Sequence, residues 1–195
     1  MKKVAITGNI GSGKTTISKF LLEKKFRVFE CDYEINKLYK TKNLKREIKK
    51  FFHKSIDNLI FKNGRINKQA LSKYVFSKPK ELRKLEKIIY IQLDKNKSKF
   101  ILENEKQKIL FFDVPLLFEK KQENNYDYVI YLYVENSAQR KRVMNRKGMD
   151  EKKFKDILKY QKNHSNSDKV SLKINTNVNI EVVKKTVLNF IEKLS

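Results

Sequence analysis

The chain contains few cysteine, glycine and acidic residues, and it lacks a long hydrophobic run. Only one of its 195 residues is a cysteine, Cys31, which excludes an internal disulfide and favours a reducing cytoplasmic location. No apolar run approaches the roughly 18 residues that a membrane-spanning helix needs, and we recognise no N-terminal signal peptide. We therefore expect a cytoplasmic protein with no membrane partner, and at this length one compact domain with a helical insertion.

Acidic residues are outnumbered by basic ones, 22 to 46, which gives a formal net charge of +24. Such a charge is compatible with nucleic-acid binding. Only seven of the basic residues are arginines, however, and the lysines are spread along the whole chain beside abundant asparagine and isoleucine. This distribution is typical of a solvated surface and not of a basic patch dedicated to binding nucleic acid. We expect no specific nucleic-acid partner, although the positive field would attract anionic ligands such as phosphorylated metabolites.

The scarce arginines are clustered in one place. Arg140, Arg142 and Arg146 fall within seven residues. In a chain that otherwise uses lysine, the cluster suggests a task that needs the planar guanidinium group, such as phosphate clamping. Arg142 and Arg146 are four residues apart, so a helix would place them on one face, where they could close over phosphates as a lid. A plain solvated face is the alternative interpretation.

The few glycines are also concentrated, three of the five lying within six residues. They belong to a run that fits the phosphate-loop pattern G-x-x-x-x-G-K-[ST] and ends in two threonines. The run is Gly8, Asn9, Ile10, Gly11, Ser12, Gly13, Lys14, Thr15 and Thr16. Glycines in such a loop let backbone N–H groups point inward at a polyphosphate, and the following helix N-terminus adds positive charge. Lys14 would reach the β- and γ-phosphates and Thr15 would ligate Mg²⁺.

Strand and helix patterns alternate on either side of a long helical stretch. We expect strands at residues 2–7, 27–31, 108–114, 126–134 and 170–176, and helices at 14–24, 137–144, 151–161 and 181–194. Residues 33–105 are mostly helical and very basic by pattern. Alternating strands and helices predict an α/β fold with a parallel sheet.

Two aspartates follow or end apolar strands in this pattern. Asp32 comes at the carboxyl end of the second strand, where a carboxylate can accept a proton from an acceptor hydroxyl, or can cap the helix that we expect to begin near Tyr33. Asp113 ends the third strand and resembles a Walker-B residue that holds Mg²⁺ directly or through water. A strand-end cap is the alternative for Asp113.

Taken together, these residues resemble the dephospho-coenzyme A kinase family over nearly the whole chain. The phosphate loop resembles the family's T-G-G-I-G-S-G-K-[ST]-T, and Glu30-Cys31-Asp32 stands where the family has D-A-D. Residues 113–119 (D-V-P-L-L-F-E) resemble the signature P-L-L-F-E, and residues 139–146 match Q-x-x-R-x-x-x-R. The chain departs from the family pattern at Lys25 for glycine, Asn36 for arginine, Tyr90-Ile91 for His-Pro, and Ser171-Leu172 for Ala-Asp.

This resemblance implies a P-loop fold with a five-stranded parallel sheet of the adenylate-kinase type. Residues 1–32 and 106–195 would form the nucleotide-binding core, with a helical lid at about 137–165, and residues 33–105 would bind the acceptor. The implied activity is ATP-dependent phosphorylation of the 3′-hydroxyl of dephospho-CoA, with Asp32 as base and Arg142 and Arg146 in the lid. Another small-metabolite kinase and a nucleic-acid-binding P-loop protein are the alternatives. We expect a monomer or a small homo-oligomer.

Overall fold

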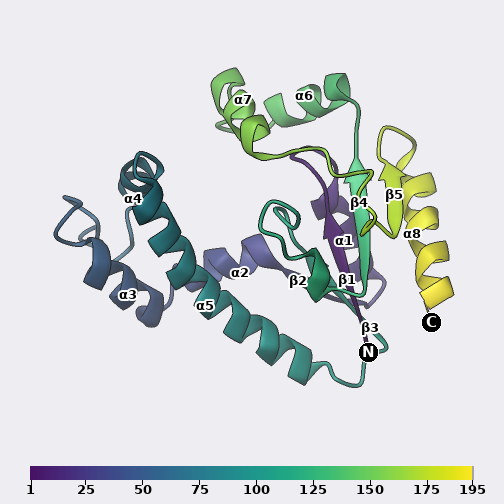
Figure 1. The fold of residues 1–195 in the computed structure, drawn as a ribbon, viewed down its shortest axis with the longest axis horizontal. Helices are drawn as coiled ribbons and strands as arrows, with labels where there is room; N and C mark the ends of the chain where they lie inside the picture. Colours follow the sequence, from purple (N-terminus) through teal and green to yellow (C-terminus); the bar gives the residue numbers. More distant parts are fainter. Residues whose placement is uncertain (195) are drawn as a thin grey trace. The chain divides into compact units, whose positions relative to one another are not determined.

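The computed structural model describes residues 1–194 and divides the chain into two compact units, Met1–Cys31 with Asn104–Ser195, and Asp32–Glu103 (Figure 1). The first unit contains a five-stranded sheet in the order β2-β3-β1-β4-β5, and every adjacent pair is parallel. Its strands are β1 (Lys2–Thr7), β2 (Arg27–Glu30), β3 (Ile109–Asp113), β4 (Tyr128–Tyr133) and β5 (Leu172–Asn175). The prediction of a five-stranded parallel α/β sheet is therefore confirmed.

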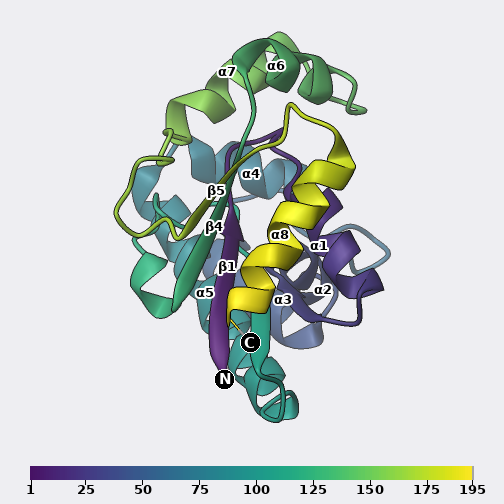
Figure 2. The same ribbon diagram turned by 90° about the vertical axis from the view of Figure 1, so that its right-hand side faces the viewer.

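The helices of this first unit cover the sheet and follow its strands. They are α1 (Lys14–Glu23), α6 (Asn136–Met144), α7 (Glu151–Tyr160) and α8 (Ile180–Leu194), with a short 3₁₀ turn at Glu123–Asn125. Helices α1 and α8 bury their apolar faces against one side of the sheet (Figure 2). Ile17 and Leu21 of α1 and Val187 of α8 share a buried cluster with Val4, Ile6, Phe111 and Ile130 of the strands. Successive side chains of a strand point to opposite faces, so the strand residues between these face the other side of the sheet.

The opposite side of the sheet is covered by the segment between β3 and β4. Phe112 packs against Tyr126, with ring centroids 5.3 Å apart, and Tyr131 packs against Phe118 at 6.2 Å. Leu117 of the same segment is fully buried. β1, β3 and β4 are thus buried on both faces, which explains their nearly continuous apolar sequences.

The second unit is built from helices. These are α2 (Cys31–Leu38), α3 (Lys42–Phe52), α4 (Lys68–Phe76) and α5 (Pro79–Glu103). The hydroxyl of Thr41 caps α3 and the side chain of Asn67 caps α4. The chain turns at Asn63-Gly64, where Gly64 has φ 72°, between Ile60 and Ile66, which form an antiparallel bridge.

The structure corrects the local setting of Asp32. We expected β2 to end at residue 31 and a helix to begin near Tyr33, whereas β2 ends at Glu30 and α2 begins at Cys31. Asp32 therefore lies inside the first turn of α2, and the alternative in which it occupies the N-cap is wrong. Asp32 and Glu34 are the acidic residues of this first turn, where the helix dipole stabilises negative charge.

Lys25 adopts a left-handed conformation where the family pattern has glycine. Its φ is 67°, and it follows the last turn of α1. The N–H of Lys25 donates to Leu22 O at 2.9 Å and that of Phe26 donates to Leu21 O at 3.0 Å, which closes the helix end. A non-glycine residue in this conformation costs about 1 kcal/mol. The hydrogen bonds that end α1 are therefore present although lysine stands in place of glycine.

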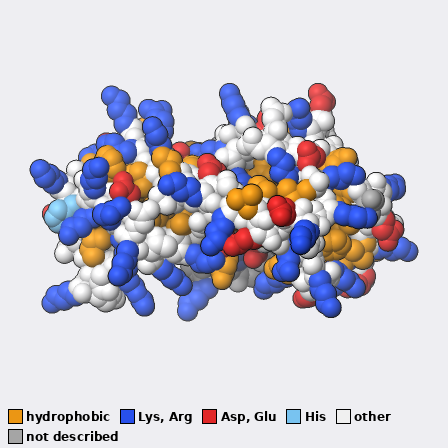
Figure 3. All heavy atoms as spheres, turned by 90° about the horizontal axis from the view of Figure 1, so that it is seen from below, with side chains coloured by type: hydrophobic (Ala, Val, Ile, Leu, Met, Phe, Trp, Pro, Cys, Tyr) orange, Lys and Arg blue, Asp and Glu red, His pale blue; other side chains and the backbone are white. Residues whose placement is uncertain are grey.

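Basic side chains are spread across the face drawn in Figure 3, with apolar and acidic side chains between them. This agrees with a solvated surface on that face. In the part of the chain that the structure describes, we find no helix with the length and hydropathy needed to cross a membrane.

Candidate active site

The loop between β1 and α1 is shaped by glycines whose positive φ angles and close neighbours disfavour a side chain. Gly8 has φ 141° and Gly11 has φ 81°. A Cβ atom on Gly8 would collide with the carbonyl oxygen of Leu132, and one on Gly11 would lie 2.9 Å from the Cγ2 of Val143. The loop therefore fits closely between β4 and α6, and Gly13 forms the N-cap of α1. This is the strand–loop–helix context that phosphate loops require.

Lys14 is held against the loop itself. Its Nζ donates to Gly8 O at 2.5 Å and is 3.3 Å from Asn9 O. The hydroxyl of Ser12 is buried and has no hydrogen-bond partner among the described residues. A buried hydroxyl without a protein partner suits a loop that receives ligand oxygens. Thr15, in the first turn of α1, is exposed and free to meet a ligand.

Two glutamines, one on α6 and one just after α7, hold the middle of the loop through hydrogen bonds. The side chain of Gln139 on α6 donates to Ile10 O at 2.8 Å, and the Oε1 of Gln161, after α7, accepts from Ile10 N at 2.7 Å. The N–H and the carbonyl oxygen of Ile10 are therefore both hydrogen-bonded to side chains. Gln139 is almost fully buried. These contacts span more than 120 residues of sequence, and they join the loop to α6 and to the end of α7.

Arg142 also joins α6 to the loop. One guanidinium nitrogen donates to Thr176 Oγ1 at 2.9 Å and lies 3.3 Å from Gly11 O, while the other donates to Thr176 O at 2.6 Å. Thr176 directly follows β5, so the fork of Arg142 ties three segments together. This use of two nitrogens on one partner residue is specific to arginine.

Arg146 does not share a helix face with Arg142, so this part of our prediction is wrong. α6 ends at Met144 and Asn145 forms its C-cap. Arg146 lies in the following turn, where its N–H donates to Val143 O at 3.0 Å, and its side chain is exposed. Gly148, at φ 78°, then lets the chain turn toward α7. Of the two arginines, only Arg142 contacts the loop through bonds that we identify.

Tyr131 and His164 form a further contact with the loop that sequence reasoning missed. The hydroxyl of Tyr131 on β4 lies 3.3 Å from Asn9 Oδ1 and accepts from His164 N at 3.2 Å. The His164 ring stacks on Phe118 with centroids 4.8 Å apart. The His164 side chain is 29% exposed, so most of the ring is covered. Burial raises the pKa of the Tyr131 hydroxyl, so it remains a protonated donor at neutral pH.

Asp113 lies at the end of β3, next to β1. Its carboxylate is nearly buried, and its Oδ2 accepts from the Ser18 hydroxyl of α1 at 3.0 Å. The carboxyl ends of parallel strands meet at one edge of a sheet, so Asp113 and the loop after β1 share that edge. Thr15 and Asp113 offer oxygen atoms of the kind that Mg²⁺ prefers. No group of three His, Cys, Asp or Glu side chains suited to a metal occurs in residues 1–194.

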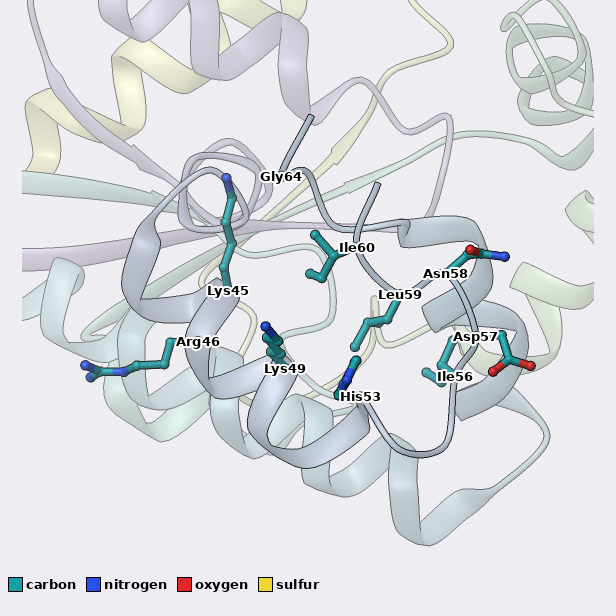
Figure 4. Close-up of a pocket in the computed structure, with 10 residues that line it drawn as sticks. All are labelled: Lys45, Arg46, Lys49, His53, Ile56, Asp57, Asn58, Leu59, Ile60 and Gly64. Carbon is teal, nitrogen blue, oxygen red and sulfur yellow. The ribbon is translucent and has the colours of Figure 1, made fainter. Parts of the chain in front are cut away.

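The helical unit contains Asp32 and a separate pocket. Asp32 is exposed on α2, and its main-chain O accepts from the side chain of Asn36 at 3.0 Å. The pocket has a volume of about 630 Å³ and lies between α3 and the chain that follows it (Figure 4). Lys49 and His53 form its basic wall and Ile60 its apolar side. None of these three residues was expected to take part in a reaction.

Comparisons with known proteins match this chain along its whole length. A family model described as dephospho-CoA kinase matches residues 2–181. A dephospho-CoA kinase of Bartonella quintana is 32% identical over 197 residues, which cover 100% of this chain and 98% of that protein. The solved structure of TT1252 from Thermus thermophilus has a TM-score of 0.85 at 23% identity, covering 100% of this chain and 98% of that one. Dephospho-CoA kinase from Campylobacter jejuni has a TM-score of 0.67 at 21% identity, with 100% and 97% covered.

Proposed function

We propose a reaction for this chain on the premise that it belongs to the dephospho-CoA kinase family. The chain is a kinase with a P-loop fold, and the reaction is transfer of the γ-phosphoryl group of ATP to the ribose 3′-hydroxyl of dephospho-CoA. The products are coenzyme A and ADP, and the step is the last in coenzyme A synthesis. We place the protein in the cytoplasm, where its single buried cysteine would remain reduced.

The observation that carries this proposal is the loop of residues 8–15 with Lys14 folded onto it. In the proposed reaction the loop N–H groups, the Ser12 hydroxyl and the first turn of α1 bind the phosphates of ATP, with Thr16 beside Thr15. Lys14 exchanges its carbonyl contacts for the β- and γ-phosphate oxygens. Its charge then stabilises the negative charge that develops on the transferred group.

The residues of the first unit fit a bound magnesium ion. The exposed hydroxyl of Thr15 and the carboxylate of Asp113 would hold Mg²⁺, directly or through water. The ion supplies positive charge to the β- and γ-phosphates when bound. The bond from Ser18 fixes the Asp113 carboxylate in one orientation, which is the kind of support that a metal ligand needs.

Asp32 is the proposed base. Its exposed carboxylate would accept the proton of the 3′-hydroxyl as the oxygen attacks the γ-phosphorus, and the bond from that phosphorus to the ADP oxygen breaks. Asp32 also orients the hydroxyl, and positioning supplies a large part of the rate in phosphoryl transfer. We propose that Asp32–Glu103 forms the acceptor-binding region.

The lid arginines have different proposed roles, and lysine substitutions separate them. We expect Arg142→Lys to lower both kcat, by about tenfold, and the thermal midpoint, because lysine cannot keep both bonds to Thr176. Arg146→Lys, at an exposed position, is expected to lower kcat while leaving the midpoint within about 1 °C. The measurements are steady-state kinetics and thermal unfolding of both variants beside wild type. An unchanged kcat in Arg146→Lys would remove Arg146 from the mechanism.

The proposed reaction is tested by measuring ADP release with one acceptor at a time. We expect rapid release with dephospho-CoA and little with AMP, CMP, gluconate or RNA. Mass spectrometry of the product identifies the phosphorylated position, and coenzyme A co-elutes with its standard. Faster release with AMP or CMP would instead indicate a nucleoside monophosphate kinase, and stimulation by RNA would indicate a nucleic-acid-dependent P-loop protein.

A further inference from the structure

The first half of the phosphate loop is bound to side chains from distant segments of the same unit. The peptide groups of Ile10 bond to Gln139 at 2.8 Å and to Gln161 at 2.7 Å. Asn9 is bound through its side chain instead, and its Oδ1 lies 3.3 Å from the hydroxyl of Tyr131 on β4. All of these residues belong to the unit that contains the sheet, so their arrangement is a property of that unit alone.

The contact at Asn9 is a departure of this chain from the family pattern. The pattern T-G-G-I-G-S-G-K has glycine at this position, and glycine offers no side chain to bind. Gln139 and Arg142, in contrast, match the family's Q-x-x-R-x-x-x-R. The backbone does not require glycine at position 9, because the positive φ angles of this loop occur at its three glycines. Asparagine therefore adds a contact here without adding backbone strain.

The Tyr131 hydroxyl is oriented by its surroundings. It accepts from the N–H of His164 at 3.2 Å, and its own proton is directed at Asn9 Oδ1. The His164 ring stacks on Phe118, and the Tyr131 ring packs against the same phenylalanine with centroids 6.2 Å apart. Burial raises the pKa of this hydroxyl, so the proton of the bond stays in place at neutral pH. Tyr131 thus offers Asn9 a donor whose direction the fold has already set.

Asn9 passes this constraint to the part of the loop that would receive phosphate. Its main-chain O accepts from Ser12 N at 3.1 Å and lies 3.3 Å from the Nζ of Lys14. Fixing the Asn9 side chain therefore restricts the residue whose carbonyl contacts both Ser12 and Lys14. A loop that is ordered before its ligand arrives loses less conformational entropy on binding, so such a restraint favours affinity.

We propose that Tyr131 is a positioning residue for ATP, which acts through Asn9 to hold the phosphate loop in the conformation that binds the polyphosphate. This inference rests on the proposed function, because it adds a residue to the ATP site of the same reaction. Tyr131 acts on the nucleotide only through the loop. Tyr131 and Asn9 both belong to the sheet unit, whereas the proposed acceptor region is Asp32–Glu103. The contact is therefore expected to affect ATP and not the acceptor.

The test is calorimetric titration with ATP in the absence of an acceptor. Tyr131→Phe keeps the ring and removes the hydroxyl, and Asn9→Ala removes the amide that it meets. Each is expected to weaken ATP binding about three- to tenfold, the usual contribution of one hydrogen bond. The double variant is expected to bind no more weakly than the weaker single variant, because both changes break the same bond. Tyr128→Phe removes a hydroxyl from the same strand, where the ring packs on Phe190, and as the matched control it should match wild type.

Steady-state kinetics separate positioning from a general loss of structure. With dephospho-CoA as acceptor, we expect KM for ATP to rise in Tyr131→Phe, while kcat and KM for dephospho-CoA stay within about twofold of wild type. Equal rises in both KM values, together with a lower thermal midpoint, would make Tyr131 a structural residue and overturn the inference. If Tyr131→Phe does not fold, Asn9→Ala decides, because it leaves β4 unaltered: an ATP affinity equal to that of wild type overturns the inference.

The double variant and the acceptor separate the remaining outcomes. A loss of ATP affinity in the double variant equal to the product of the two single losses would show that Tyr131 does not act through Asn9, and it overturns the inference. None of these results changes the proposed function. If wild type binds ATP but does not phosphorylate dephospho-CoA, the proposed function fails, and the titrations with ATP alone still decide the role of Tyr131.

Discussion

Replacing Lys14 by alanine is expected to abolish phosphoryl transfer and to leave the fold intact. The ammonium of Lys14 donates to loop carbonyls, and Lys14 does not belong to the buried core, so its removal takes no apolar packing from that core. In the transition state the same ammonium would stabilise charge on the transferred phosphoryl group. Loss of one such electrostatic contact costs about 10²- to 10³-fold in kcat. We expect a loss at the upper end of this range or beyond it.

The measurement is kcat for ADP release together with the thermal midpoint and far-ultraviolet circular dichroism. Lys19→Ala provides a matched control, because Lys19 is an exposed lysine on the same helix, one turn further along. A Lys14→Ala protein that folds and keeps at least half of the wild-type turnover would contradict the assignment of the phosphate loop. A fall in the midpoint without a fall in kcat would make Lys14 a structural residue.

Asp32→Asn is expected to keep ATP binding and to lose about 10²- to 10⁴-fold in kcat, the usual contribution of a general base. Asparagine has the same size but does not accept the proton of the acceptor hydroxyl. Since Asp32 lies in the first turn of α2, the substitution also removes a favourable interaction with the helix dipole. That interaction is worth about 0.3–1 kcal/mol, so a small decrease in stability accompanies the large loss of rate.

A second aspartate in the same unit controls for this change. Asp57 is exposed, and Asp57→Asn makes the same alteration of charge in residues 32–103. We expect Asp57→Asn to match wild type in kcat and in the affinity for ATP, measured by calorimetric titration. If Asp32→Asn retained nearly full turnover, Asp32 would not be the base, and the acceptor hydroxyl would lose its proton to another group or to solvent.

Much of this fold was predictable because its signals are local. The strand patterns of β1, β3 and β4 are short apolar runs, and their boundaries differ from the prediction by two residues or fewer. The phosphate loop is recognisable because the glycine positions are fixed by steric limits within eight residues. Arg146 was harder to place, since an i, i+4 spacing indicates a shared face only while the helix continues, and α6 ends at Met144.

The sequence by itself determined the nucleotide loop, the parallel α/β class and the family, because each depends on residue types at short, fixed spacings. Only the tertiary structure decided how the loop is held. The bonds of Gln139 and Gln161 to Ile10 and the bond from Tyr131 to Asn9 join residues more than 120 positions apart. No periodicity in the sequence encodes such contacts, because they arise when β4, α6 and α7 pack beside the loop. In the same way, the hydrogen bond from Lys68 to Asn36 becomes visible only when α2 and α4 are folded together.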